Sequence, residues 1–203
     1  MMRGGIAWAL VLALSLAGCG RSAPVPTDTY YRLAPIHSPQ NRHLVDGTLL
    51  IEAIEADVLY RERALLYSED AADLTLKQYH YHHWEEAPPR LLQLHLQEFL
   101  RAAGAATNVT LRDNDNSAAL HVHGRLFRFE HILGGDTVTA RVGMELSLVD
   151  RNGHTLTQHQ YVVDKPAASR DVEAVVQATD EAVNEVFARF LDDAAKSVSG
   201  VSK

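Results

Sequence analysis

The side chains best suited to chemistry in this sequence are histidines, and three of them fall in one short segment. Residues 79–86, YHYHHWEE, combine these histidines with two carboxylates. Imidazole nitrogens and carboxylate oxygens are zinc ligands, and on a strand His80 and His82 would point to the same face. His121 and His123 repeat that spacing and could supply a second pair of ligands. The sharpest chemical hypothesis from these residues is a zinc site.

The alternative is an aromatic-rich strand end whose imidazoles lie half-exposed at the surface, and the rest of the sequence favours it. There is no His-Glu-x-x-His spacing, and a single cysteine offers no thiolate pair. The chain also lacks the Gly-x-Ser-x-Gly elbow of serine hydrolases, a P-loop and the glycine pattern of dinucleotide-binding folds. We therefore predict no metal, no cofactor and no enzymatic activity.

Cys19, the only cysteine among 203 residues, lies at the end of a secretory leader. Arg3 supplies a positive charge, and residues 6–17 (IAWALVLALSLA) are too short to span a bilayer, which needs about 20 apolar residues. The LAGC sequence at 16–19 resembles the lipobox of bacterial lipoproteins, which implies cleavage before Cys19 and lipidation, palmitate included, of its thiol and new amino group. The alternatives are an ordinary signal peptide with a chance cysteine and a retained membrane anchor.

These features divide the chain into a signal peptide over 1–18, a lipidated cysteine and tether over 19–28, and a single periplasmic domain over 29–203. The tether, CGRSAPVPTD, is small, polar and proline-bearing. The net charge of −7 and the lack of a basic stripe argue against nucleic acid as a partner. Membrane attachment must come from the lipid, and Gly20 favours the outer membrane because an aspartate there would indicate inner-membrane retention.

Alternating apolar residues and turn signals predict a sheet over much of the domain. Three long strands are expected at 119–130, 137–149 and 155–163, joined by turns at 134–136 and 151–153 into an antiparallel meander. Shorter strands are expected at 30–33, 49–54 and 109–111, and a hairpin at 64–68 and 74–79 with a polar link between its strands.

Two segments change to helical spacing. The first opens at Pro88-Pro89, carries apolar residues at positions 92, 96, 99, 100 and 103, and ends at Gly104. The second starts after Ser169 and keeps one apolar face for about 25 residues, with Asp180 among the charged residues expected outside that face. The expected fold is an α+β two-layer domain, in which a mostly antiparallel sheet packs against two main helices.

The order of these elements resembles the ABC-type transport auxiliary lipoproteins, the PqiC-like family. The matching residues are Tyr30-Tyr31-Arg32-Leu33 after the tether, the segment from Leu49 to Arg61, and Tyr79 to Pro89 with the leucine-rich helix up to Leu100. The Trp-x-Glu-x-Pro-Pro pattern at 84–89 is the most specific part of the resemblance. Where an arginine commonly precedes that tryptophan in the family, this chain has His83.

The resemblance implies a non-catalytic lipoprotein of a mammalian-cell-entry (MCE) type transport system. Its partners would be an MCE-domain protein with its ABC permease and ATPase, docked by a domain that is lipid-anchored at the periplasmic face of the outer membrane. By analogy the system performs lipid transport, of phospholipid or another hydrophobic molecule, and the lipoprotein forms a homo-oligomer. The main alternative is a periplasmic binding module that itself carries a hydrophobic ligand between the sheet and its helices.

Tyr79 and Trp84 are the aromatic residues that we single out in the matching segment. Both offer a large apolar area with a polar edge, which suits either a core anchor or a contact with a partner protein. Pro88-Pro89 would fix how the strand turns into the helix. The residues leave the choice between core and partner contact open.

Overall fold

The computed structural model describes residues 26–36, 41–69, 74–112, 117–134 and 137–201. The signal peptide, Cys19 and most of the tether lie outside the described residues, as do residues 70–73 of the polar link and 135–136 of the first turn of the meander. The strands are β1 Thr29–Tyr31, β2 Val45–Ile51, β3 Glu55–Ala56, β4 Ala64–Ser68, β5 Lys77–Trp84, β6 Ala106–Thr110, β7 Leu120–Gly134, β8 Thr137–Asp150 and β9 Thr155–Pro166. The helices are the 3-10 helix η1 Val58–Arg61, α2 Pro88–Ala102 and α3 Val172–Val201.

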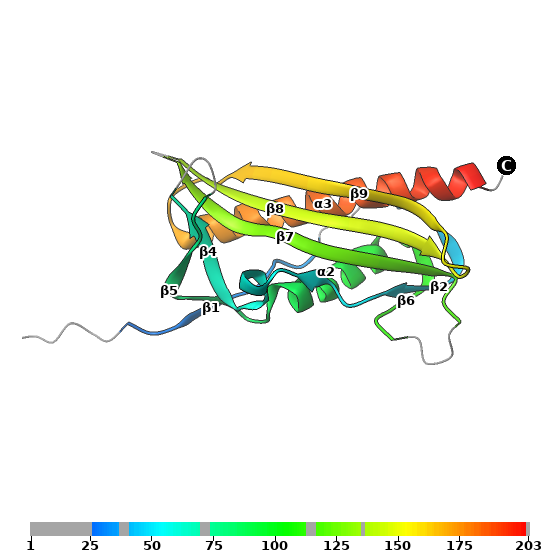
Figure 1. The fold of residues 1–203 in the computed structure, drawn as a ribbon, viewed down its shortest axis with the longest axis horizontal. Coiled ribbons are helices and arrows are strands. Elements are labelled where there is room, and N and C mark those ends of the chain that lie inside the picture. Colours follow the sequence, from blue (N-terminus) through cyan, green and yellow to red (C-terminus); the bar gives the residue numbers. More distant parts are fainter. Residues whose placement is uncertain (1–25, 37–40, 70–73, 113–116, 135–136, 202–203) are drawn as a thin grey trace, which may run out of the picture.

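The central strand of the sheet is β7. Along one side it pairs antiparallel with β8 over its whole length, and β9 continues this meander beyond β8. Along its other side β7 takes three partners in turn, β2, β3 and β4, all parallel to it. The sheet continues from β2 to β6, and from β4 through β5 to β1. One long strand therefore joins two groups of short strands (Figure 1).

The predicted α+β class with two main helices is confirmed. The sheet is mixed, because five of the eight strand pairs among the described residues are parallel. These parallel pairs are short, and the long pairings of β7 with β8 and of β8 with β9 are antiparallel, as the predicted meander requires. Strand β3 and helix η1 were not predicted, because elements of two and four residues carry too little periodicity to be recognised.

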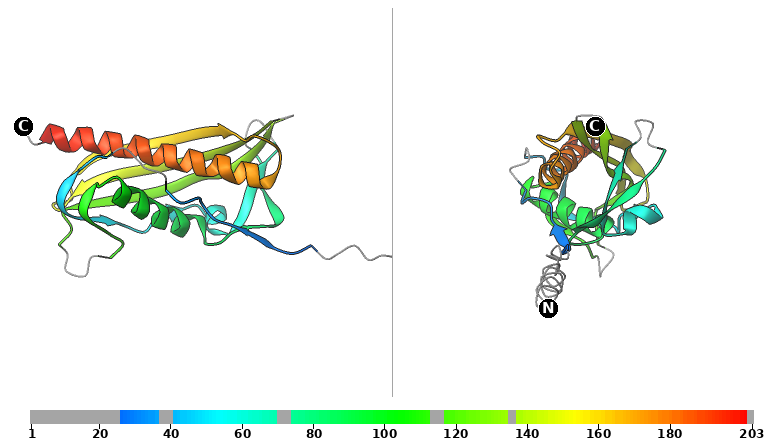
Figure 2. Two further views of the ribbon diagram at one scale, coloured as in Figure 1. Left: turned by 180° about the vertical axis from the view of Figure 1, so that it is seen from behind. Right: turned by 90° about the vertical axis from the view of Figure 1, so that its left-hand side faces the viewer.

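The sheet curls, and the two helices lie along its concave side (Figure 2). The long helix α3 packs on β8 and β9, and α2 packs on β6, η1 and α3. Each helix has one apolar face, and burial of that face against the sheet stabilises the fold. Within the described residues, neither helix is long and apolar enough to cross a membrane.

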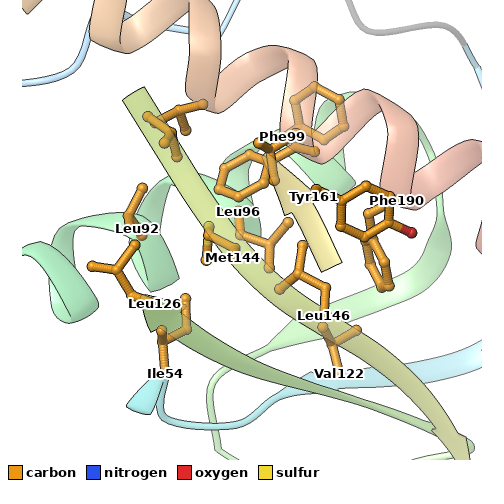
Figure 3. Close-up of a cluster of buried hydrophobic side chains, with 14 of the residues drawn as sticks. Ile54, Leu92, Leu96, Phe99, Val122, Leu126, Met144, Leu146, Tyr161 and Phe190 are labelled. Atoms are coloured by element: carbon orange, nitrogen blue, oxygen red, sulfur yellow. The ribbon is translucent and has the colours of Figure 1, made fainter. Parts of the chain in front are cut away.

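Side chains fill the space between the sheet and the helices. Leu92, Leu96 and Phe99 of α2 point towards Leu126 of β7 and Met144 of β8 (Figure 3). The largest side chains with less than 2 % exposure are Trp84, Phe187, Phe190, Leu49, Ile51, Leu65, Leu92, Leu96, Leu100, Leu126, Met144 and Leu146. Each such side chain stabilises the fold by about 1.5–3 kcal/mol through its removal from water.

At two positions the structure explains why the residue is glycine. Gly104 follows α2 with φ of +64°, the left-handed conformation that ends helices, as its position in the sequence predicts. Gly143 lies opposite the register shift of β7 between Leu126 and Arg128. A Cβ on Gly143 would lie 2.7 Å from Cε2 of Phe127 and 2.9 Å from Cβ of Arg128. The close approach of these side chains therefore requires glycine.

Candidate functional site

The segment that carries the family resemblance forms a corner at which β1, β4, β5 and α2 meet. The backbone N–H of Trp84 donates to the carbonyl of Arg63 (2.7 Å), and Nε of Arg63 donates back to the carbonyl of Trp84 (3.0 Å). The N–H of Glu85 donates to the carbonyl of Tyr31 (2.7 Å). Pro88 then occupies the first turn of α2, where a missing N–H costs nothing. Hydrogen bonds to the residues before β4 and at the end of β1, together with Pro88, thus fix the direction in which the chain leaves β5 and enters α2.

Trp84 lies in the core below this corner. Its side chain is 2 % exposed, and its ring centroid is 5.0 Å from that of Phe129 on β7. This position fits the core-anchor alternative, because the ring has no surface left to offer to a partner.

Tyr79 is half-buried on β5, between its neighbours on two other strands. Its ring centroid lies 4.7 Å from that of Tyr67 on β4 and 5.6 Å from that of His131 on β7. Burial is the main cause that raises the pKa of the Tyr79 hydroxyl, which therefore stays protonated at neutral pH. Tyr79 joins three strands, and like Trp84 it serves packing in this structure.

A surface groove of about 390 Å³ opens beside the corner, along α2. Its walls combine apolar side chains with three carboxylates and one guanidinium; they are Arg32, Leu33, Ala34, Pro35, Glu85, Glu86, Leu91, Leu94, His95 and Glu98. Nε of Arg32 lies 3.4 Å from Oε2 of Glu85, and both side chains are solvent-exposed. The groove is therefore a mixed surface, with an apolar floor and an acidic rim.

His95 is the one polar wall residue of this groove that is deeply buried, with 6 % exposure. Its Nε2 has no hydrogen-bond partner among the described residues, and it lies 3.8 Å from Oδ1 of Asp180 on α3. The same carboxylate accepts the backbone N–H of Ala34 at 3.1 Å. Burial lowers the pKa of the His95 imidazole to about 4, so this ring is neutral at neutral pH. His95 therefore links the wall of the groove to Asp180 of α3.

His95 carried no prediction, and the expectation that Asp180 lies outside the apolar face was wrong, because its side chain is only 15 % exposed. A signal was present, because position 95 follows Leu92 by three residues and precedes Phe99 by four, which places it on the apolar face of α2. Asp180 lies four residues after Val176 and three before Val183, on the buried face of α3. A polar residue at such a position needs a buried partner.

The histidines that suggested a zinc site lie in separate places. Nδ1 of His82 is 2.9 Å from the hydroxyl of Tyr31, and Nε2 of His83 is 3.5 Å from the carboxylate of Asp28. His121 instead approaches Glu52, with Nδ1 3.2 Å from Oε1, and stacks on His123. His121 and His131 are ten positions apart on β7, which corresponds to about 33 Å along a strand. Strands β4 and β5 lie beside the His131 end, so the histidines of β5 are far from His121. The described residues contain no group of three or more potential ligands that could hold a metal ion.

A curled mixed sheet with two helices on its concave side, a filled interior and a mixed surface groove define an α+β domain. The sequence matches the family of ABC-type transport auxiliary lipoprotein components over residues 31–189. The chain belongs to that family, which confirms the resemblance found in its sequence. Among curated proteins, none matches the sequence significantly.

Two solved structures share this fold. A protein of Xanthomonas campestris, described as a member of the family DUF330, superposes with a TM-score of 0.75 at 17% sequence identity. That match covers 86% of this chain and 99% of the other. A second, uncharacterized protein superposes with a TM-score of 0.66 at 12% identity, covering 82% of this chain and 97% of its own. The likeness at these identities concerns the fold.

Proposed function

We propose that this protein is a non-catalytic auxiliary component of an ABC transport system of the MCE type, anchored by lipid on Cys19 to the periplasmic face of the outer membrane. It docks the MCE-domain protein, and the permease and ATPase of the system supply the energy. The transported cargo is phospholipid or another hydrophobic molecule. Family membership and the lipobox-like LAGC sequence support this proposal.

The filled interior is the observation that favours a scaffold over a carrier of hydrophobic ligands. A carrier needs an apolar cavity of about 300–1,000 Å³. Between the sheet and the helices, Leu96, Met144, Leu146, Phe187 and Phe190 instead occupy the space, each with less than 2 % exposure. The groove of about 390 Å³ lies outside this core and has an acidic rim, which suits a polypeptide better than a lipid chain.

The groove along α2 is the surface that we propose for the partner. Leu91 and Leu94 offer apolar contact, while Glu86 and Glu98 would attract a basic side chain. We therefore expect a partner segment with an apolar residue next to a lysine or arginine. Leu94→Asp should abolish co-purification of the MCE protein from membranes in mild detergent. Val162→Asp, at an exposed apolar position on β9, is the matched control and should leave the complex intact.

The lipid anchor is tested separately with Cys19→Ala. The variant should remain folded and move from the membrane fraction to the soluble periplasmic fraction. The chain has 18 basic against 26 acidic residues once Arg3 is removed, so it gains no electrostatic attraction to anionic lipid, and a few surface aromatic side chains do not replace the acyl chains. Fractionation of the cell envelope and immunoblotting measure this. Continued membrane association together with unimpaired transport would contradict the proposal of a lipid-tethered adaptor.

A further inference from the structure

The folded domain has two distinct ends, and the chain enters at one of them. Thr29 of β1 pairs with His82 of β5, and both strands lie at one end of the molecule (Figure 1). The turn between β8 and β9 and the last residues of α3 lie at the other end. Strand β8 has 14 residues, so that the two ends are about 45 Å apart.

The length of the tether decides which end lies near the membrane, given the lipid on Cys19 that the proposed function requires. Cys19 and Thr29 are ten residues apart, and the chain between them spans at most about 35 Å. A bilayer contact through the far end would hold Thr29 about 45 Å from the membrane, which exceeds that reach. Of the two ends, only the one with β1 and β5 can therefore reach the bilayer.

This end carries a cluster that we call the tyrosine patch, formed by Tyr30, Arg63, Tyr81 and His83. Tyr30 pairs with His83, and their ring centroids lie 5.6 Å apart. Tyr81 lies two residues before His83 on β5, in the stretch where the pairing with β4 shifts register. The guanidinium carbon of Arg63 is 5.1 Å from the ring centroid of Tyr30. Tyr30 is 56% exposed and Tyr81 44%, although large apolar rings are costly to leave in water.

The chemistry of the tyrosine patch matches the headgroup region of a bilayer. Tyrosine is enriched there because its ring is apolar and its hydroxyl is polar, and arginine extends its charge towards the headgroups. Strand β5 carries Lys77 and three histidines but no carboxylate, in a protein of net charge −7. Asp28 and Glu69 are the acidic partners of His83 and Lys77. We propose that the tyrosine patch rests in the headgroup region of the membrane that holds the Cys19 lipid.

The experiment uses the mature lipidated protein in vesicles of phosphatidylethanolamine and phosphatidylglycerol. Since Cys19 is the only native cysteine, a thiol introduced by Tyr81→Cys can be labelled alone with a fluorophore. Brominated lipid should quench this label at least threefold more than a label introduced by Asn152→Cys in the β8–β9 turn. Tyr30→Ser in the labelled protein should reduce the quenching, and Val162→Ser, an equally exposed control, should not.

Flotation of the vesicles separates the two proposals. If the protein does not float with the vesicles, the lipid anchor fails and this inference fails with it. If it floats but both labels are quenched equally, or the Tyr81→Cys label is reached by aqueous iodide and not by bromine, the anchor stands and the membrane contact is overturned. A label shielded from both quenchers would show that protein, such as a second copy, covers the patch, which also overturns it.

Discussion

His95 and His131 are buried on α2 and β7, and they face consecutive residues of α3. Nε2 of His95 lies 3.8 Å from Oδ1 of Asp180, and Nε2 of His131 lies 3.3 Å from the hydroxyl of Thr179. Burial lowers the pKa of His95 to about 4 and that of His131 to about 3. The ordinary histidine pKa is about 6.5, which applies to the unfolded chain. Packing of α3 therefore depends on two neutral imidazoles.

This difference in pKa predicts that stability falls as the pH falls below about 6.5. Between pH 6.5 and 4 the unfolded chain binds protons at these histidines and the folded protein does not, so acid favours unfolding. At pH 5 the loss is about 2 kcal/mol for each histidine relative to pH 7.5. Urea unfolding at the two pH values measures it. His95→Gln should lose less than the wild type on acidification, whereas the exposed control His80→Gln should lose as much; equal losses in all three proteins would refute the assignment.

The role of a single residue could be predicted from the sequence only where neighbouring residues in the chain determine that role. Trp84 is followed by a proline pair that turns the chain, and this context indicated a fixed corner. His95 and Asp180 gained their roles from each other, although they are on different helices. The spacing within each helix places these residues on a buried face, but it does not identify the partner that satisfies them, since that partner is distant in the sequence.

At the scale of elements, the register shift between β7 and β8 beside Gly143 is a point where packing leaves no room for a side chain. Gly143→Ala should lower the free energy of unfolding by about 1–3 kcal/mol, because the ring of Phe127 and the stem of Arg128 must move. The matched control is Gly134→Ala in β7, where an added Cβ meets nothing within 4 Å. Urea unfolding compares the two variants. A loss for Gly143→Ala no larger than for the control would show that the strands adjust freely.

Apart from β3 and η1, the individual elements were predictable to within a few residues, but several strand pairings were not. The meander followed from alternation and tight turns, which are local features. The parallel pairs of β1 with β5 and of β2 with β7 join segments about 50 to 70 residues apart. No local signal fixes such a register, because it depends on which apolar faces meet once the helices have packed.

At the scale of the whole molecule, β7 joins both groups of short strands and α3 runs along the meander. We therefore expect residues 29–203 to unfold in one cooperative transition. Trp84 reports on the β1–β5 end, and it is the only tryptophan in the sequence of residues 29–203. Its fluorescence and the far-ultraviolet circular dichroism should give the same urea midpoint. Separated midpoints would mean that the two ends fold as independent units.

The position of β7 in the chain also bears on secretion. The strands before residue 112 form only two separate groups, β1–β5–β4 and β2–β6, and β3 has no partner among the described strands except β7. These groups cannot share a sheet until Leu120 and the residues after it are available. More than half of the chain must therefore be available before the domain closes. In the export to the periplasm that the proposed function requires, this order would keep the polypeptide unfolded during translocation.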